Sequence, residues 1–435
     1  MITLSLDQIG YLLDEFYDLG RLVSARFLDK GFVNTSYEIV IEKSGREGRY
    51  FFRLYRPGSS TPKVRFEHSL MAELKQRGFG LTPRLIPTRS GETFLELEER
   101  SWCRRGPCHL AIFSHLAGED NHAWDRPECT RAELSSAAET LGRYHTAIFG
   151  WQVKRDWPEP PIIGALPGFG PRWLKLAKEA GRTGFDRHFL SNAEEAAELA
   201  ESLRSELSPA LYRVLPRLAV HGDFHPGNLK FDRGRVVGLF DFDWANLDLR
   251  IFDLALALNY FCATWEPAVE GRLNIDRMEL FLKRYQIFTA RAGRGPGPLN
   301  EPELAVLPQL LQIGNLYILD WIVDDFYQTG ADSELYLGYL LHRLRMNRWL
   351  DRHSDRLAGI FQDHRRLFLK YEPRPWAAGL EEVPDQVPEP RPLMENLIRP
   401  REGLYRGRKG LDFGRVRMGE APPKGRSNPT KPKDN

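Results

Sequence analysis

The segment that most constrains this chain is His221-Gly-Asp-Phe-His-Pro-Gly-Asn228, which is followed by Leu239-Phe-Asp-Phe-Asp243. A Pro-Gly pair separates Asp223 from Asn228, so we expect a tight loop rather than a helix, with both side chains turned towards one pocket. The apolar runs after Asn228 are split by a polar turn, which predicts a hairpin that returns Asp241 to the side of Asn228. A carboxylate that can accept a proton then lies close to two oxygen ligands of the kind that Mg²⁺ prefers.

The composition disfavours several classes of protein. The chain has 435 residues, 42% of them hydrophobic, which is enough for a large core and for two or three domains. The net charge is only +2, so no global field favours binding to nucleic acid or to an acidic membrane. Four cysteines without a C-x-x-C pair disfavour a cysteine zinc site and a disulfide scaffold, and we expect a cytoplasmic location. We expect no signal peptide, and the most apolar stretch, 251–263, is too short for a bilayer, so no membrane partner is expected.

The spacing of apolar residues divides the chain into parts of different character. In residues 1–115, short strands surround one amphipathic helix at 63–77, which predicts an antiparallel sheet with an inserted helix. In residues 116–370, helical patterns dominate around one β insertion at 218–243. Helices are predicted at 131–149, 191–206, 248–262, 277–291, 302–328 and 333–369, and a structured loop at 150–172, where Pro, Gly and Trp are frequent. We therefore expect an α+β fold with a small β-rich lobe and a large, mostly helical lobe.

Residues 371–435 form a third segment, which is rich in proline, poor in large apolar residues and basic towards its end. We expect a disordered tail there. Contact with nucleic acid through this charge is an alternative that the composition leaves open, although such tails also serve as flexible, solubilising segments.

The spacing of Asp223 and Asn228, with a further aspartate on the following hairpin, matches the catalytic loop of kinases. Gly222 stands where protein kinases carry an arginine, and this variant resembles the aminoglycoside phosphotransferase and choline kinase family, the small-molecule branch of the protein-kinase-like fold. The resemblance covers roughly residues 20–370. It implies a two-lobed kinase-like fold and an enzyme that uses ATP and Mg²⁺ to phosphorylate the hydroxyl group of a small molecule. It also implies that Asp223 is the catalytic base and that Asn228 and Asp241 are the metal ligands.

By the same resemblance, the small lobe binds the nucleotide. A hairpin over the phosphates is expected at Gly31-Phe-Val-Asn-Thr-Ser36, where backbone N–H groups and polar side chains are offered by Gly31, Asn34, Thr35 and Ser36. The cation on the next strand is expected at Arg53, since arginine keeps the positive charge that many kinases supply with lysine. Its acidic partner on the following helix is expected to be Glu67, with Glu73 as the second candidate.

Other polar residues near the motif have two interpretations each. His225 is a candidate for contact with substrate or phosphate, or a structural residue. Asp243 is a candidate for contact with the substrate or for support behind the metal ligands. His221 is expected to organise the loop backbone, and Asp253 to cap the next helix or to hold the catalytic loop.

The acceptor is the part of the function that the sequence determines least. The run GLFDFDWANLDLRIFDLALALNYFC, residues 238–262, is similar to type II homoserine kinases, which implies homoserine as acceptor, with choline, another amino-alcohol or an aminoglycoside as alternatives. Asp324 shares a helix face with Asp320, beside Trp321, and this face could hold an ammonium group or could be a solvated surface. Homoserine also needs a cation for its carboxylate, and three candidates remain open: Arg343, Arg345 and Arg348.

Two other classes of function remain as alternatives. A metallohydrolase would use as its His/Asp cluster His221, Asp223, His225, Asp241 and Asp243, although this leaves Asn228 and the small lobe without a role. The chain could also be a nucleotide-binding protein without catalysis. Neither a Walker A nor a Rossmann glycine motif occurs, which disfavours those two nucleotide folds.

Overall fold

The computed structural model describes residues 4–28, 34–56, 59–97, 108–153, 160–268, 270–330 and 333–366. All of them belong to the first of the two units into which the chain divides, Met1–Ile398 and Arg399–Asn435. The predicted tail and Gly31 lie outside the described residues.

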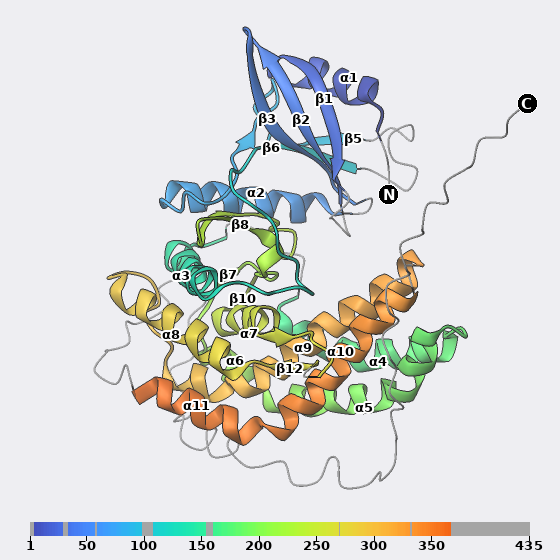
Figure 1. Ribbon diagram of the computed structural model, residues 1–435, viewed down its shortest axis with the longest axis vertical. Coiled ribbons are helices and arrows are strands. Elements are labelled where there is room, and N and C mark those ends of the chain that lie inside the picture. Colours follow the sequence, from blue (N-terminus) through green and yellow to red (C-terminus); the bar gives the residue numbers. More distant parts are fainter. Residues whose placement is uncertain are drawn as a thin grey trace, which may run out of the picture. The chain divides into compact units, whose positions relative to one another are not determined.

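The N-terminal lobe is built around an antiparallel sheet (Figure 1). Its elements are α1 (Leu6–Phe16), β1 (Arg21–Leu28), β2 (Thr35–Lys43), β3 (Arg46–Leu54), α2 (Thr61–Gln76), β4 (Leu85–Ile86), β5 (Leu95–Leu97) and β6 (Cys108–Ser114). The strand order is β1-β2-β3-β6-β4, and β5 pairs with β6. Arg53 on β3 lies opposite Ser36 on β2 and Ala111 on β6, so it occupies the middle of the sheet.

The two faces of this sheet have different partners because side chains alternate along each strand. Phe52 and Leu54 of β3 are fully buried in a core that also contains Ile9 and Leu13 of α1. The opposite face presents Arg53 and, just after the strand, Tyr55, which packs with α2 in the core that continues into the helical lobe. The sheet therefore carries its cation on the face that is turned away from α1.

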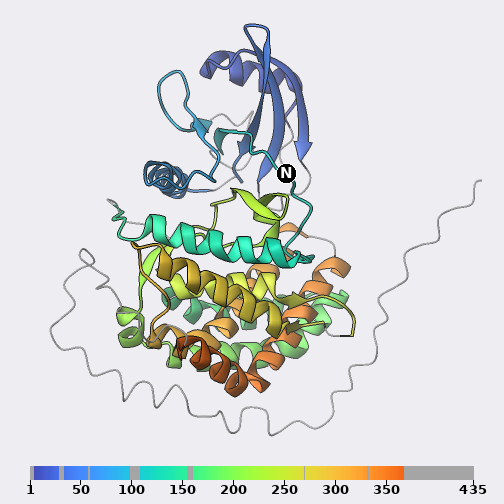
Figure 2. The ribbon, with the colours of Figure 1, turned by 60° about the vertical axis from the view of Figure 1, so that its left-hand side comes forward.

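The second lobe is mostly helical. Its helices are α3 (Arg131–Ile148), α4 (Ile162–Glu179), α5 (Gly184–Glu206), α6 (Pro209–Val214), α7 (Arg250–Phe261), α8 (Ile275–Arg291), α9 (Glu301–Thr329), α10 (Ser333–Arg352) and α11 (Ser354–Arg366). Its strands are β7 (Arg217–Val220), β8 (Leu229–Asp232), β9 (Arg235–Leu239), β10 (Asn246–Leu249), β11 (Ala263–Thr264) and β12 (Arg272–Leu273), with a 3₁₀ turn, η1, at Pro226–Asn228. In Figure 2, α3 and α8 run alongside each other, and the two helices are in contact.

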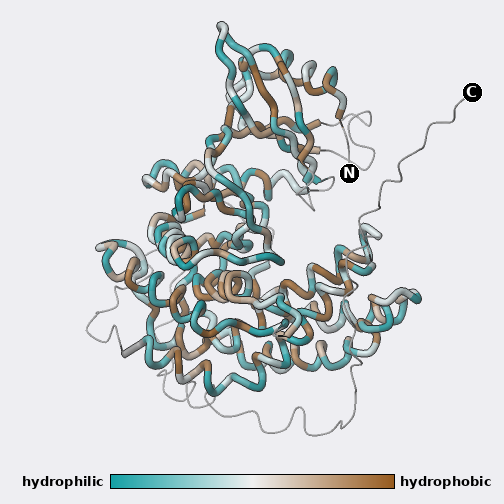
Figure 3. Tube along the Cα trace, in the orientation of Figure 1, coloured by the Kyte–Doolittle hydropathy of each residue, from teal (hydrophilic) through white to brown (hydrophobic). Residues whose placement is uncertain are grey.

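Helix α7 forms the centre of this lobe. Every one of its residues is buried, and its trace is largely brown, the colour of apolar residues, in Figure 3. It packs against α9, the one helix among the described residues that is long and apolar enough to cross a membrane by length and composition. Since 83% of that apolar window is buried inside the protein, burial in the core accounts for the apolar character of α9.

The predicted fold class is confirmed, with three local differences. The predicted loop at 150–172 is wrong from Ile162 onward, because α4 begins there and contains Pro167 and Pro171. The apolar residues Ile162, Leu166, Phe169 and Trp173 follow helical spacing and are all buried, so packing outweighs the prolines. The helix predicted at 191–206 begins earlier, at Gly184, and the one predicted at 333–369 is two helices, α10 and α11, separated at His353.

Candidate active site

The sequence motif at residues 221–243 forms a loop followed by a hairpin, and the start of the hairpin lies close to its end. The loop leaves β7 after Val220 and ends in η1, where Asn228 leads directly into β8. Strands β8 and β9 pair as a hairpin, with Leu229 opposite Leu239. The Phe240 N–H then donates to the carbonyl of Asn228 at 3.1 Å. This bond brings Asp241, the next residue, to the side of Asn228, as predicted.

Asp223 is held by three side-chain donors. Asn228 Nδ2 lies 3.0 Å from Asp223 Oδ2, His225 Nε2 lies 3.3 Å from the same oxygen, and the Tyr260 hydroxyl donates to this carboxylate. Burial by itself would raise the pKa of Asp223, but the neighbouring His225 and His221 rings, together with the hydrogen bond from the Tyr260 hydroxyl, bring the pKa below its usual value. Asp223 is therefore an ionised carboxylate in a fixed orientation at neutral pH.

The backbone of the loop is held by a buried aspartate. Asp253 on α7 accepts from the N–H of His221 at 2.9 Å and from that of Gly222 at 3.0 Å, and it lies 3.0 Å from His145 Nε2. Of the two roles predicted for Asp253, it holds the loop. It does not cap the helix, because α7 begins at Arg250 without a side-chain cap.

The two histidines of the motif are occupied by local contacts. His221 is fully buried, its Nδ1 accepts from the Asp223 N–H at 3.3 Å, and its Nε2 lies 3.1 Å from the carbonyl of Phe240. His225 Nδ1 accepts from the Gly227 N–H at 3.0 Å. Since His225 Nε2 faces Asp223, both ring nitrogens of each histidine have local contacts, which disfavours the metal cluster of the metallohydrolase alternative.

Gly222 has a steric reason to be glycine. Its φ is +76°, in the left-handed region, and a Cβ at this position would overlap the carbonyl oxygen of Trp244 on the segment after β9. The loop and the hairpin approach each other too closely here for any side chain. This contact explains why the arginine of protein kinases is absent.

Replacing Gly222 by alanine is expected to lower the free energy of unfolding by about 2 kcal/mol or more, because the variant combines backbone strain with the overlap at Trp244. Urea unfolding and catalytic activity measure the effect. Gly338→Ala on α10 is the matched control, since its Cβ meets nothing within 4 Å. The control is expected to be neutral or slightly stabilised. A Gly222→Ala protein as stable as the wild type would contradict this account of the loop.

Arg53 lies at the centre of a group of carboxylates from both lobes. Its guanidinium is 2.8 Å from Asp243 Oδ1, 3.1 Å from Asp241 Oδ1 and 3.5 Å from Glu67 Oε1. Glu67, the predicted partner, also accepts from the Tyr55 hydroxyl at 2.8 Å. Burial raises the pKa of the Glu67 carboxyl, and nearby Asp243 adds to this, although Arg53 opposes it. Three acidic side chains share one cation, so this group has more acidic groups than positive charge to balance them.

The predicted metal ligands fit a divalent cation. Asp241 Oδ1 is buried, and although it lies 3.1 Å from the Arg53 guanidinium, it accepts no hydrogen bond from any residue that the structure describes. Asn228 directs its amide nitrogen to Asp223, which leaves its oxygen as the atom available to a cation. Asp241 has a positive φ of 65°, which is unusual for a residue other than glycine and typical of functional sites. Two hard oxygen donors beside an excess of negative charge suit Mg²⁺.

The hairpin that is predicted to cover the phosphates is described at residues 34–36, and these residues lie beside Arg53. Asn34, Thr35 and Ser36 are buried, and Ser36 lies directly opposite Arg53 across the β2–β3 pair. The Asn34 amide group donates to Asp243 and accepts from the Arg56 N–H, so it joins the two lobes. An adjacent pocket is lined by Tyr55, Arg56, Ser59, Lys63, Val64, Glu67, Asp243 and Trp244.

The acidic face on α9 is partly used by other contacts. Asp320 pairs with Arg172 and accepts from Trp173 Nε1 at 2.9 Å, both on α4, so it links two helices. Asp324 accepts from Gln328 Nε2 at 2.6 Å, on its own helix. A role for Asp324 in holding an ammonium group stays a prediction.

Comparison with known proteins identifies the family. The profile described as the phosphotransferase enzyme family matches residues 24–282, more than half of the chain. The chain belongs to this phosphotransferase family. The predicted enzyme class, a small-molecule kinase, is thereby confirmed.

Individual relatives of this phosphotransferase agree with the family. A homoserine kinase of Gluconobacter oxydans is 26% identical over 330 residues, which is 73% of this chain and 87% of the relative. The structure is similar in fold to amicoumacin kinase hAmiN, with a TM-score of 0.55 and 16% identity over 81% of this chain and 94% of that one. It is also similar to an ethanolamine kinase of Plasmodium vivax, with a TM-score of 0.51 and 12% identity over 78% and 86% of the two chains.

The sequence by itself does not indicate Tyr260, and it does not distinguish Arg343 from two other candidate arginines. In the sequence, Tyr260 belongs to the apolar helix predicted at 248–262, yet its hydroxyl contacts Asp223. Arg343 was one of three equivalent arginines, yet it is fully buried and lies 5.7 Å from the centre of the Tyr260 ring. A polar tip at the end of an otherwise apolar helix is the one signal that could have indicated Tyr260.

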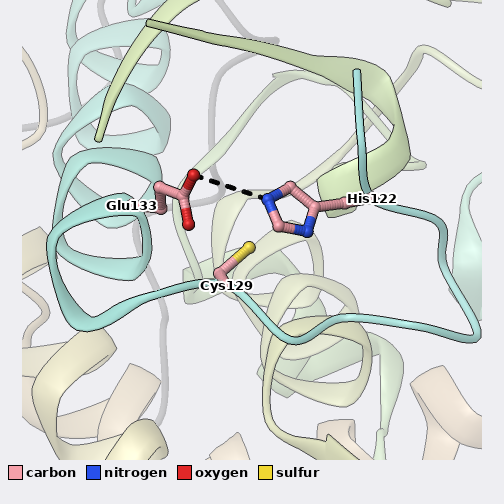
Figure 4. A group of neighbouring side chains, drawn as sticks. All are labelled: His122, Cys129 and Glu133. Atoms are coloured by element: carbon pink, nitrogen blue, oxygen red, sulfur yellow. Dashed lines mark ion pairs between the residues drawn. The ribbon is translucent and has the colours of Figure 1, made fainter. Parts of the chain in front are cut away.

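A separate group of side chains, of the types that can bind metal ions, lies at the start of α3 (Figure 4). His122 Nε2 is 3.6 Å from Glu133 Oε1, and Cys129 lies beside them. Glu133 also accepts from the Thr130 N–H at 2.7 Å as part of a capping box, and burial raises the pKa of the Cys129 thiol to about 12. Glu133 therefore caps α3 in addition to its ion pair with His122.

Proposed function

We propose that this protein transfers the γ-phosphate of ATP to the hydroxyl group of a small molecule in a Mg²⁺-dependent reaction, with homoserine as the first candidate acceptor. The observation that carries the proposal is the fixed, ionised Asp223 on a loop whose hairpin returns Asp241 to its side. Phosphoryl transfer requires little covalent chemistry from the protein, and its main requirements are positioning and neutralisation of charge.

Asp223 is suited to the acceptor hydroxyl. Its carboxylate is ionised and oriented by Asn228, His225 and Tyr260, so it can accept a hydrogen bond from the hydroxyl and take its proton as the new P–O bond forms. The three donors also limit the number of carboxylate orientations, which favours one approach of the acceptor.

Arg53 is suited to the nucleotide phosphates. It is a buried guanidinium that Glu67 and Asp243 keep in place, and the hairpin residues Thr35 and Ser36 lie beside it. A planar guanidinium can donate to phosphate and carboxylate oxygens together. Asn228 and Asp241 would hold Mg²⁺, which supplies neutralisation of phosphate charge when it is bound.

Homoserine is favoured over other acceptors by the curated relatives. Matching proteins named homoserine kinase align over most of their length, as in the Gluconobacter oxydans relative. The solved structures with similar folds have other acceptors in their names, and their identity to this chain is too low to choose among them. Fold by itself does not determine the substrate.

The proposal is tested by kcat/KM for a panel of acceptors with ATP and Mg²⁺: homoserine, serine, threonine, choline, ethanolamine and an aminoglycoside. We expect homoserine to have the highest value, by about tenfold or more over the amines without a carboxylate. An enzyme that prefers choline or an aminoglycoside would retain the reaction class and reject the substrate. Absence of transfer to any acceptor, with ATP still bound, would favour a non-catalytic nucleotide-binding protein.

A further inference from the structure

Arg343 on α10 is a buried cation with most of its donors unused. It has no exposed surface, and its Nη1 lies 3.2 Å from Asn315 Oδ1. Its Nε and Nη2 are buried and have no hydrogen-bond partner among the described residues, and no carboxylate of the described chain pairs with it. An unpaired buried charge is strongly unfavourable, so the burial of Arg343 without a carboxylate partner needs an explanation.

Another fully buried arginine of the helical lobe, Arg250, shows how the protein satisfies such a group. Arg250 forms two hydrogen bonds with Glu303, at 2.6 and 2.5 Å, and donates to the carbonyls of Gly297 and Pro298. Arg343 instead faces aromatic rings, at 5.6 Å from Trp124, 5.7 Å from Tyr260 and 6.0 Å from Trp265. Aromatic faces offset part of the lost hydration of a cation but accept no in-plane N–H bonds.

The charge of Arg343 survives its burial. Loss of hydration lowers the pKa of the guanidinium to about 10, so the group is still cationic at neutral pH. The adjacent side chain of Trp265 adds a further donor, since its indole N–H is buried without an acceptor among the described residues. Two neighbouring side chains therefore offer N–H groups to an acceptor that this part of the chain does not supply.

These donors lie close to the catalytic carboxylate. Tyr260 separates them from it, with its ring against the Arg343 guanidinium and its hydroxyl on Asp223. The His225 ring is 5.2 Å from the Tyr260 ring, so the same aromatic group also borders the other side of the base. Trp265 is partly exposed, so this aromatic wall reaches the surface.

The neighbouring arginines of α10 are already paired. Arg345 forms an ion pair with Glu270, and Arg348 donates to Glu195 at 2.8 Å and to Asn192 at 2.7 Å. Among the three arginines that the sequence left open, Arg343 is therefore the one whose guanidinium lacks a carboxylate in the described structure.

We propose that Arg343 and Trp265 form the receptor for a carboxylate on the acceptor, so that this kinase selects a hydroxyl-bearing amino acid over an amino-alcohol. This inference rests on the proposed function. The free Nε and Nη2 of Arg343 form the planar pair that binds both oxygens of a carboxylate, and Trp265 Nε1 adds a third bond. A carboxylate bound there leaves the hydroxyl at the other end of a short acceptor to meet Asp223.

The test compares the binding of homoserine with that of 3-amino-1-propanol, which has the same hydroxyl and amine without the carboxylate. Calorimetric titrations are made with a non-hydrolysable ATP analogue and Mg²⁺ present. We expect the wild type to bind homoserine about 30-fold or more tightly than 3-amino-1-propanol. We expect Arg343→Met to abolish this difference through weaker homoserine binding alone. Equal binding of the two ligands by the wild type would overturn the proposal, as would the absence of homoserine binding.

Matched variants separate recognition from folding. Arg345→Met removes a paired arginine of the same helix and is expected to keep the preference for homoserine. Trp265→Phe keeps an aromatic ring without the N–H donor and is expected to reduce the preference, which provides a second test if Arg343→Met does not fold. An Arg343→Met protein that folds and keeps the full preference would overturn the proposal.

Phosphate transfer by the same wild-type protein reports separately on the proposed function. Transfer to homoserine with equal efficiency for 3-amino-1-propanol would reject the receptor and retain the kinase. Carboxylate-dependent binding without any transfer would retain the receptor and reject the kinase. The two failures are therefore distinguishable.

Discussion

Replacing Asp223 by alanine is expected to reduce phosphate transfer by about 10²–10⁴-fold while the protein stays folded and still binds ATP. Asp223 is partly buried and is held by Asn228, His225 and Tyr260, whose donors all converge on this carboxylate. No other carboxylate of the described chain has this set of contacts. The loss is expected mainly in kcat, because we propose that the carboxylate contacts the acceptor hydroxyl and not the nucleotide base.

The matched control for this change is Asp232→Ala. Asp232 ends β8 on the same hairpin, and its side chain is 64% exposed. The control is expected to keep the wild-type kcat and KM. Initial rates at several ATP and acceptor concentrations, with circular dichroism to verify folding, measure both variants. An Asp223→Ala enzyme that retains a tenth of the wild-type kcat would contradict the assignment of Asp223 as the base.

Replacing Asp241 by asparagine is expected to lower phosphate transfer by about 100-fold and to raise the melting temperature of the metal-free protein. The loss of activity follows from the loss of a charged group at the proposed metal site. The gain in stability follows from charge crowding, because Asp241 shares Arg53 with two further acids, Glu67 and Asp243. A neutral amide relieves this excess of negative charge.

The direction of the stability effect can be derived from the pKa of Asp241. Burial raises this pKa, Arg53 opposes the rise, and the neighbouring Asp243 and Asp223 carboxylates add to it. A carboxyl whose pKa is higher in the folded than in the unfolded state binds more protons when folded, so stability falls as the pH rises through that interval. At neutral pH the ionised Asp241 therefore destabilises the metal-free protein, and asparagine removes this effect.

Thermal unfolding at neutral pH, with EDTA or with increasing Mg²⁺ and an ATP analogue, measures both consequences. The wild type is expected to gain stability with Mg²⁺, and Asp241→Asn to gain less. Asp232→Asn, on the exposed hairpin turn, is the control and is expected to respond to Mg²⁺ as the wild type does. A metal-free Asp241→Asn protein that melts below the wild type would contradict the proposed charge crowding.

The core of the site was predictable because its geometry is local. Pro226 and Gly227 fix a short loop, and the polar turn after β8 fixes the return of Asp241, so a spacing of a few residues determines which side chains meet. The pairing of Arg53 with Glu67 was predictable for a different reason, since it rests on resemblance to kinases. The structure brings these two residues within 3.5 Å of each other.

The remaining contacts depend on packing between distant elements, which a single sequence does not specify. Tyr260 on α7 contacts Asp223 on the loop after β7. Arg343 on α10 contacts the ring of Tyr260. Each contact joins elements that are far apart in the sequence. Spacing along α10 does not distinguish Arg343 from Arg345, because the distinction lies in whether another element supplies a carboxylate. Helix α4 was also not predicted. Its prolines indicated a loop, but packing of its apolar face against the core favours a helix.

The central claim, that this chain is a Mg²⁺-dependent kinase with homoserine as its acceptor, is tested most directly by ³¹P nuclear magnetic resonance of the wild-type protein incubated with ATP, Mg²⁺ and homoserine. The account predicts a new phosphomonoester signal that grows in equal amount with ADP. Formation of ADP with inorganic phosphate alone, or no turnover of ATP, would contradict it.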